Sequence, residues 1–163
     1  MAKIDFSGLD EYADFLSQVG LEMEREIMGE AIYKGASVVF EEINKGISSI
    51  PTDETWGTRE HPQFGLNRLQ KAGLHESLGI ARMRNDDGFL NVKIGFDGYN
   101  KIKTERWPNG QPNAMVARSI ERGTSWLKAT PFVKKSIAAV KQRVLGVMMV
   151  VFEEKIHAIA ERK

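Results

Sequence analysis

The segment IERGTS, residues 120–125, followed by PFV at residues 131–133, decides the fold of the C-terminal third of the chain. Gly123 comes directly after an apolar-periodic run, where glycine ends helices because it takes left-handed backbone angles without a Cβ penalty. Pro131 stands where a new periodic run begins, and its missing N–H costs nothing in a first helical turn. The pattern predicts a short helix over 114–122, a loop and a long C-terminal helix.

Two long helices are predicted, one in each terminal third. Apolar residues recur every three or four positions from Leu9 to Ile43 and again from Phe132 to Ile159. This spacing is the period of one helix face. The first helix should end near residues 44–46, since Pro51 cannot continue it. Glycines within it leave two readings open, one kinked helix or two consecutive helices.

The centre of the chain predicts a β-hairpin over about residues 77–96. Residues 77–83 and 89–96 alternate between apolar and polar side chains, and Asn85-Asp86-Asp87-Gly88 between them is a turn sequence. A lone hairpin is marginally stable in water, so it needs a helix against its apolar face. We therefore expect a single α+β domain over residues 1–163, with long N- and C-terminal helices packed on a small antiparallel β-sheet.

Two long loops are expected, over residues 51–72 and 97–113, because proline and glycine interrupt any period there. A short helical turn over residues 66–72 is left open. Structureless loops of this length are uncommon in a compact domain and are usually functional. We expect both loops to be mobile in the free protein and to order on assembly.

The sequence offers no catalytic or cofactor chemistry. It has no cysteine and a formal net charge of +1, which excludes disulfides, thiolate metal sites and cysteine nucleophiles. His61, His75 and His157 lack acids or histidines at ligand spacing, and no phosphate loop or nucleophile elbow is present. We expect no enzyme, no cofactor and no metal. The longest apolar run, residues 145–152, is too short for a membrane span of about 20 residues.

Aromatic residues in the predicted loops are the candidate interface. Loop tryptophans often anchor interfaces because they bury a large area with few rotamers. The alternative, that they fold back over the small sheet, stays open. Residues 147–152 are apolar nearly all round their helix, which fits either a subunit interface or a central helix wrapped by its own domain. The candidate interface residues are Trp56, His61, Tyr99, Trp107 and Trp126.

An ordered series of short motifs resembles the tail-component family of long-tailed bacteriophages and prophages, the small tail-completion proteins of the head–tail junction. The similarity runs from about residue 8 to residue 140. The chain departs from the family by its insertion over residues 54–70 and by Arg122, where an aromatic residue is common. The positions that match are Pro51, Gly73, Leu74, Ser77, Gly95, Glu121, Gly123, Thr124, Pro131 and Phe132.

The resemblance implies a non-enzymatic virion protein at the neck, where a finished tail is closed and joined to a DNA-filled head. Its implied partners are other copies of itself in a ring, a tail-tube or tail-terminator protein, and a head-connector protein. The implied location is the virion neck or tail, with assembly in the cytoplasm of the bacterial host.

The alternative function is a small single-strand nucleic-acid-binding module. Basic residues alternate with aromatic ones in the middle of the chain, as in surfaces that stack bases and contact phosphates. Interspersed acids and the near-neutral net charge make nucleic acid the less favoured partner. The residues concerned are Phe64, Arg68, Lys71, Arg82, Arg84, Phe89, Lys93, Tyr99, Lys101, Lys103, Arg106 and Trp107.

Overall fold

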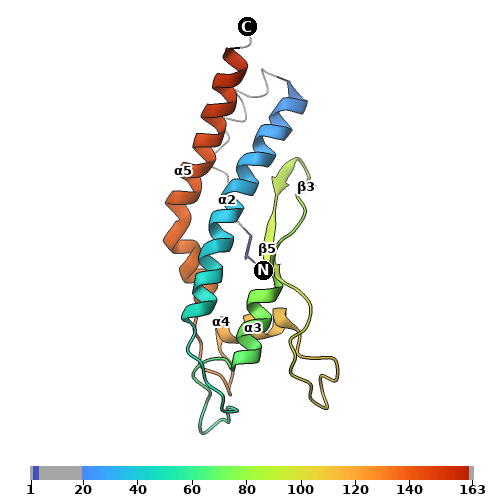
Figure 1. The fold of residues 1–163 in the computed structure, drawn as a ribbon, viewed down its shortest axis with the longest axis vertical. Helices are drawn as coiled ribbons and strands as arrows, with labels where there is room; N and C mark the ends of the chain where they lie inside the picture. The colour runs from blue at the N-terminus through green and yellow to red at the C-terminus, as the bar shows by residue number, and fades with distance from the viewer. Residues whose placement is uncertain (1, 4–19, 162–163) are drawn as a thin grey trace.

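The computed structural model describes residues 2–3 and 20–161. Two long helices stand side by side, a small sheet lies against one of them, and two short helices with long loops close one end (Figure 1). The predicted α+β class is thereby confirmed. The first part of the N-terminal helix prediction, from Leu9 to Val19, lies outside the described residues.

The two long helices are α2 (Leu21–Ser49) and α5 (Phe132–Ala160). Their facing stripes form most of the core, to which α2 contributes Ala31, Ala36 and Val39 and α5 contributes Val144 and Met148. The bounds of α5 match the prediction. Within its described length α2 is one uninterrupted helix that runs past the predicted end.

The longer α2 has a packing reason. Ile47 and Ile50 are fully buried, so the apolar stripe extends one turn beyond residues 44–46. The helix then stops before Pro51, and the Ile50 N–H donates to the Ile47 carbonyl at 3.2 Å. The ε-ammonium of Lys71 donates to the carbonyls of Ser48 and Ile50, at 3.2 and 2.7 Å. It thereby satisfies carbonyls that every helix end leaves without a partner.

The predicted hairpin over residues 77–96 is present, as two antiparallel ladders joined by an irregular step. One sheet has the order β1-β5-β2 and the other pairs β3 with β4. Ile80 faces Ile94 while Arg84 faces Asn91, so residues 81–83 lie opposite only Val92 and Lys93. An extra residue on one strand bends and twists a hairpin. The strands are β1 (Ala2–Lys3), β2 (Leu78–Ile80), β3 (Arg84–Asp86), β4 (Phe89–Asn91) and β5 (Lys93–Phe96).

Two short helices, α3 (Arg68–Ser77) and α4 (Asn113–Arg122), lie at the loop end of the molecule. α3 is a full helix where a loop was expected over residues 51–72 and only a short turn over 66–72 was left open, and it contains Ser77, which was expected in a strand. A capping box starts it: the Asn67 side chain accepts from the Gln70 N–H at 2.8 Å, and Gln70 Oε1 accepts from the Asn67 N–H at 3.2 Å.

The junction between α4 and α5 is fixed by the segment that opened the sequence analysis. Both oxygens of Glu121, in the last turn of α4, accept hydrogen bonds from the first turn of α5, from the N–H groups of Val133 at 2.9 Å and Lys134 at 3.0 Å. A carboxylate there satisfies free donors and complements the positive end of the helix dipole. Phe132, almost fully buried, meets the ring of Phe96 edge-on at 6.0 Å.

Gly123 ends α4 with φ of 75° and ψ of 164°. The predicted positive φ is confirmed, but ψ is extended, so the chain leaves the helix outward instead of curling into a left-handed turn. Its N–H donates to the Ser119 carbonyl at 2.8 Å.

Removing the carboxylate of Glu121 should destabilise the junction. Glu121→Ala is expected to lower the free energy of unfolding by about 1–2 kcal/mol, because two helix-start donors lose their acceptor. Glu105→Ala, at an exposed acid of the loop between β5 and α4, is the matched control and should change it by less than about 0.5 kcal/mol. Urea denaturation followed by circular dichroism measures both. Equal midpoints for the two variants would disprove the cap.

A side chain at Gly123 should be costly. Its Cβ would lie 3.0 Å from the Ala129 backbone nitrogen, at a φ that β-branched residues avoid, so Gly123→Val should lose about 1–2 kcal/mol or more. Gly146→Ala is the control, since a Cβ at that helical position meets nothing within 4 Å, and it should gain about 0.5–1 kcal/mol. A thermal midpoint for Gly123→Val equal to that of wild type would contradict the assignment.

Candidate functional site

The loop between α2 and α3, residues 51–67, is closed at its base by backbone hydrogen bonds. The Pro51 carbonyl accepts from the Leu66 N–H at 3.0 Å, and the Leu66 carbonyl accepts from the Asp53 N–H at 3.0 Å. The two ends of the loop therefore lie side by side, which makes it a compact Ω-type loop and not an extended linker.

Asp53 organises the interior of the same loop. Its carboxylate accepts from the Thr55 hydroxyl at 2.6 Å and from the N–H groups of Thr55 and Phe64 at 2.9 and 3.0 Å. Its own carbonyl accepts from the Gln63 side-chain amide at 2.8 Å. The Thr55 hydroxyl, and then the two N–H groups, hold the pKa of Asp53 below its ordinary value.

Loop 51–67 is also tied to the segment between α4 and α5, residues 123–131. The Gln63 N–H donates to the Trp126 carbonyl at 2.8 Å, and the Lys128 N–H donates to the Gln63 carbonyl at 2.8 Å. Gly57 lies so close that a Cβ there would be 1.8 Å from the Trp126 carbonyl oxygen, so only glycine fits. These bonds order the loop without a partner, which argues against the expected mobility.

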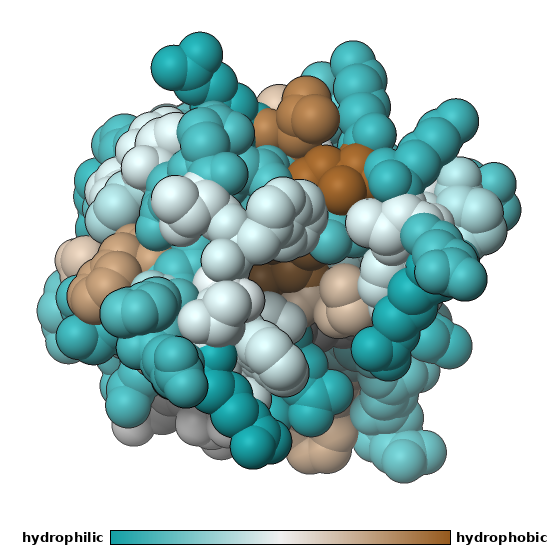
Figure 2. All heavy atoms as spheres, turned by 90° about the horizontal axis from the view of Figure 1, so that it is seen from below, coloured by the Kyte–Doolittle hydropathy of each residue, from teal (hydrophilic) through white to brown (hydrophobic). Residues whose placement is uncertain are grey.

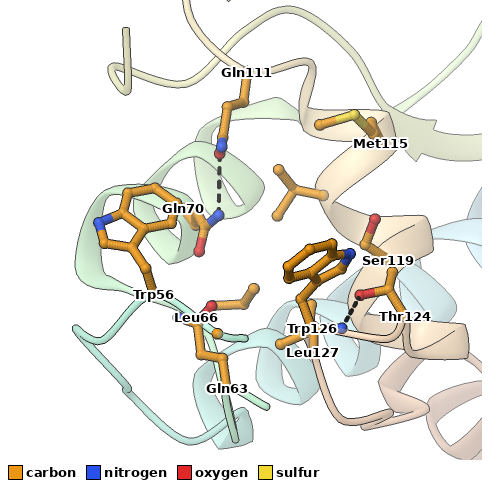
Figure 3. A pocket seen from close by; sticks show the side chains of 12 residues that line it. Trp56, Gln63, Leu66, Gln70, Gln111, Met115, Ser119, Thr124, Trp126 and Leu127 are labelled. Carbon is orange, nitrogen blue, oxygen red and sulfur yellow. Dashed lines mark hydrogen bonds between the residues drawn. The ribbon is translucent and has the colours of Figure 1, made fainter. Parts of the chain in front are cut away.

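Loop 51–67 and the segment 123–131, together with α3 and α4, line a cavity of about 290 Å³. Figure 3 shows the indoles of Trp56 and Trp126 on opposite sides of it. Trp56 is 62% exposed and Trp126 is 52% exposed, although both line the cavity. The cavity can admit a large apolar side chain between two aromatic walls. Its remaining lining residues are Gly57, Gln63, Leu66, Gln70, Gln111, Met115, Val116, Ser119, Thr124 and Leu127.

A buried amide network fixes one wall of the cavity. Gln111 Oε1 accepts from the side-chain amides of Gln70 at 3.0 Å and Asn100 at 3.1 Å. Asn100 Oδ1 in turn accepts from the N–H groups of Ile102 and Gln111. The network links α3 to the loop between β5 and α4, residues 97–112. Buried polar groups that satisfy one another specify a single arrangement.

A shallow groove of about 510 Å³ adjoins the cavity and shares Thr124 and Leu127 with it. It carries two cationic side chains, those of Arg122 and Lys128. Lys128 Nζ lies 4.7 Å from the ring centre of Phe64, a cation–π contact. Figure 2 views this end of the molecule and shows a hollow with an apolar floor, rimmed by paler and strongly polar residues.

The structure brings together only two of the five candidate interface residues, Trp56 and Trp126. His61 is exposed on loop 51–67, with its N–H donating to the Thr58 hydroxyl. Tyr99 is 63% exposed on loop 97–112 and does not line the cavity. Trp107 is half-buried, with the guanidinium of Arg106 5.4 Å from its ring centre. The hydrogen bonds and the cation–π contact of Trp107 are with Thr104, Arg106 and Gly110 of its own loop, and none of them joins it to the small sheet.

The residues that carry the family resemblance lie in the core, in the sheet or at the ends of helices, where they support the fold. Leu74 is fully buried in α3, beside Gly73, and Gly95 pairs with Gly79 in the sheet. The Pro51 carbonyl accepts from the Leu66 N–H, and the Ser77 carbonyl accepts from the Asp97 N–H. The Thr124 hydroxyl accepts from the Trp126 N–H at 3.2 Å (Figure 3). Pro131 precedes the first residue of α5, Phe132.

One arrangement outside the cavity has the order of a nucleophile, a base and an orienting group. Ser48 Oγ lies 3.4 Å from His75 Nε2, and His75 Nδ1 lies 2.6 Å from Asn44 Oδ1. Ser48 also donates to the Asn44 carbonyl, and neither the cavity nor the groove includes these three residues. Partial burial, and then the charge of Lys71, lower the pKa of His75. The contacts hold α2 against α3.

Among residues 2–3 and 20–161, no group of three or more histidines and acids is placed to hold a metal ion. Over the same residues, no helix is both long and apolar enough to cross a bilayer.

None of the protein-family models, curated proteins or solved structures with which the chain was compared matches it.

The basic and aromatic residues of the nucleic-acid alternative do not form one strip. Arg84 and Phe89 belong to the β3–β4 hairpin and Arg82 lies just before it, whereas Lys101 and Lys103 lie on loop 97–112 at the other end of the molecule (Figure 1). The ammonium of Lys71 is engaged by the carbonyls at the end of α2, and the exposed Arg68 lies 3.6 Å from the carboxylate of Glu54.

The Thr55 hydroxyl should control the titration of Asp53. Because the pKa of Asp53 is depressed in the folded chain, its contribution to stability is complete above the ordinary value of about 3.8 and is lost as the pH falls through the lowered pKa. Thr55→Val should raise this pKa, since it removes the shortest hydrogen bond to the carboxylate. Carboxyl carbon chemical shifts in an NMR titration report it.

Thr58→Val is the control on the same loop, because that hydroxyl accepts from His61 and does not contact Asp53. An Asp53 titration midpoint that Thr55→Val leaves unchanged would refute the assigned cause.

Proposed function

We propose that the protein is a non-enzymatic structural component of a phage or prophage virion, which completes the tail and joins it to the head at the neck. One observation supports a docking role above all. Two exposed tryptophans from segments far apart in the sequence, Trp56 and Trp126, flank a largely apolar cavity, and a backbone hydrogen bond from Gln63 to the Trp126 carbonyl joins the two segments that carry them.

Such a surface is suited to binding a protein. Tryptophan is enriched among the residues that dominate binding energy, because it offers a large apolar face and few rotamers to freeze. The Gln63–Trp126 and Asp53–Thr55 hydrogen bonds order loop 51–67 and the segment 123–131 before a partner binds. Ordering before binding lowers the entropy lost on association. A cavity between two aromatic walls then accepts one anchor side chain of the partner.

The residues that carry the family resemblance build this same end. Glu121 fixes the start of α5, and Gly123 sets the direction in which the chain leaves α4. The segment between α4 and α5, residues 123–131, carries Trp126 and lines both the cavity and the groove. The motif thus positions a docking surface, and no catalytic role is needed to account for it.

The proposed partners are other copies of the chain, a tail-tube or tail-terminator protein, and a head-connector protein. The proposed location is the virion neck, after assembly in the host cytoplasm. A neck component must present one surface to the tail or to its own copies and another to the head. The cavity end supplies one of these surfaces.

Loss of the two indoles should block head–tail joining without unfolding the protein. The double variant Trp56→Ala with Trp126→Ala should leave the circular dichroism spectrum unchanged, because both side chains are more than half exposed. In complementation of a phage that lacks this gene, it should yield filled heads and free tails, with joined particles reduced at least about tenfold, as expected when an interface hot spot is removed. Electron microscopy counts the three species.

Leu69→Ala is the matched control, at an exposed apolar residue of α3 that does not line the cavity, and it should give normal virions. Normal yields from the double tryptophan variant would overturn the cavity as the joining surface. Joined, infectious particles from the phage without the gene would overturn the neck function itself.

A further inference from the structure

The β3–β4 hairpin, residues 84–91, is an arm that lies beside α2, with its inner side against the body and its turn exposed. Every residue of β3 is exposed, and Phe89 at the start of β4 is 76% exposed, the highest value among the large apolar side chains that the structure describes. The adjoining turn is acidic, with Asp86 and Asp87 both exposed. The turn end of the arm therefore presents one aromatic ring next to two carboxylates, while the exposed Arg84 lies at the other end of β3, opposite Asn91.

The arm is rigid although it is exposed. Asp87 and Gly88 have φ of 56° and 92°, as in a tight two-residue hairpin turn, and Asn85 Oδ1 accepts from the Gly88 N–H at 2.9 Å. Asn91 donates to the Asp86 carboxylate at 2.9 Å. At the base, the Met83 N–H donates to the Tyr33 hydroxyl of α2 at 2.9 Å. A fixed projection with an aromatic tip is preorganised for docking.

The cavity end has the complementary chemistry. Its cavity of about 290 Å³ has the two indoles as aromatic walls, and the adjoining groove carries Arg122 and Lys128. An aromatic ring that enters the cavity would therefore have cations beside it, where the arm has Asp86 and Asp87. Complementary charge around an apolar anchor favours one partner and one orientation.

We propose that the arm of one copy docks into the cavity of the next, with Phe89 between Trp56 and Trp126 and with Asp86 and Asp87 facing Arg122 and Lys128. This contact deepens the self-association that forms part of the proposed function, and it rests on that function. Phe89 supplies the anchor, and the carboxylates set the orientation of the arm.

The contact joins different copies head to tail. The arm lies along the upper half of α2, whereas loop 51–67 lies at the opposite end of the molecule (Figure 1). A rigid arm cannot enter the cavity of its own chain. Two unlike surfaces on each copy produce a ring if the rotation closes and a filament if it does not.

The absence of cysteine from the chain gives a direct test by cross-linking. Arg84→Cys on the arm and Ser125→Cys in the groove place one thiol on each side of the proposed contact. A short bis-maleimide added to the purified double variant should give a ladder of dimers, trimers and larger species at protein concentrations up to about 1 mM. Each single variant should give dimers at most, because a ladder needs two unlike sites on every copy.

Adding Phe89→Asp to the double-cysteine variant should abolish the ladder, since it removes the anchor and leaves both thiols in place. Leu69→Asp is the matched control at another exposed apolar residue, and it should leave the ladder intact. A double-cysteine variant without a ladder, or a ladder that survives Phe89→Asp, would overturn the arm contact.

The test separates this contact from the neck function. The purified protein needs no phage to form the ladder, whereas complementation needs no cross-linker. If the ladder is absent while the tryptophan variants still block joining, the arm contact is wrong and the tail-completion proposal stands. If the ladder forms while the phage without the gene is infectious, the arm contact stands and the neck function is wrong.

Discussion

The contact on which the loop end depends is the carboxylate of Glu121 on the first turn of α5. It fixes the distance between the end of α4 and the start of α5. The segment between them must then close within residues 123–131, which places the Trp126 carbonyl where the Gln63 N–H can donate to it. Loop 51–67 is positioned through that bond, and with it Trp56. One helix cap therefore supports both walls of the cavity.

Local sequence chemistry predicted much of the fold. The three- and four-residue period gave α5 with its bounds, because its stripe packs on a single partner helix, and Gly123 and Pro131 marked the break before it. The local sequence pattern did not predict α3. Its Asn67–Gln70 capping box was visible in the sequence but lay among glycines and prolines that suggested a loop. The predicted end of α2 was too early, because the burial of Ile47 and Ile50 depends on packing that no local pattern reveals.

The candidate site was less predictable than the fold. Trp56 and Trp126 were each singled out as loop aromatics, but their pairing depends on backbone hydrogen bonds between Gln63 and the segment after α4. Backbone bonds leave no trace in side-chain pattern, and neither does the close approach of Gly57 to Trp126. The same limitation explains Trp107, which was equally plausible by sequence and is half-buried in its own loop.

The central claim is that the tryptophan-walled cavity is covered when the protein is assembled into the virion. Hydroxyl-radical footprinting with mass spectrometry reads the solvent exposure of single side chains, in the free protein and in purified joined particles. The account predicts strong oxidation of Trp56 and Trp126 in the free protein and clear protection of both in the particles, with the exposed Met149 on α5 as an internal reference. Equal oxidation of the two tryptophans in both samples would contradict it.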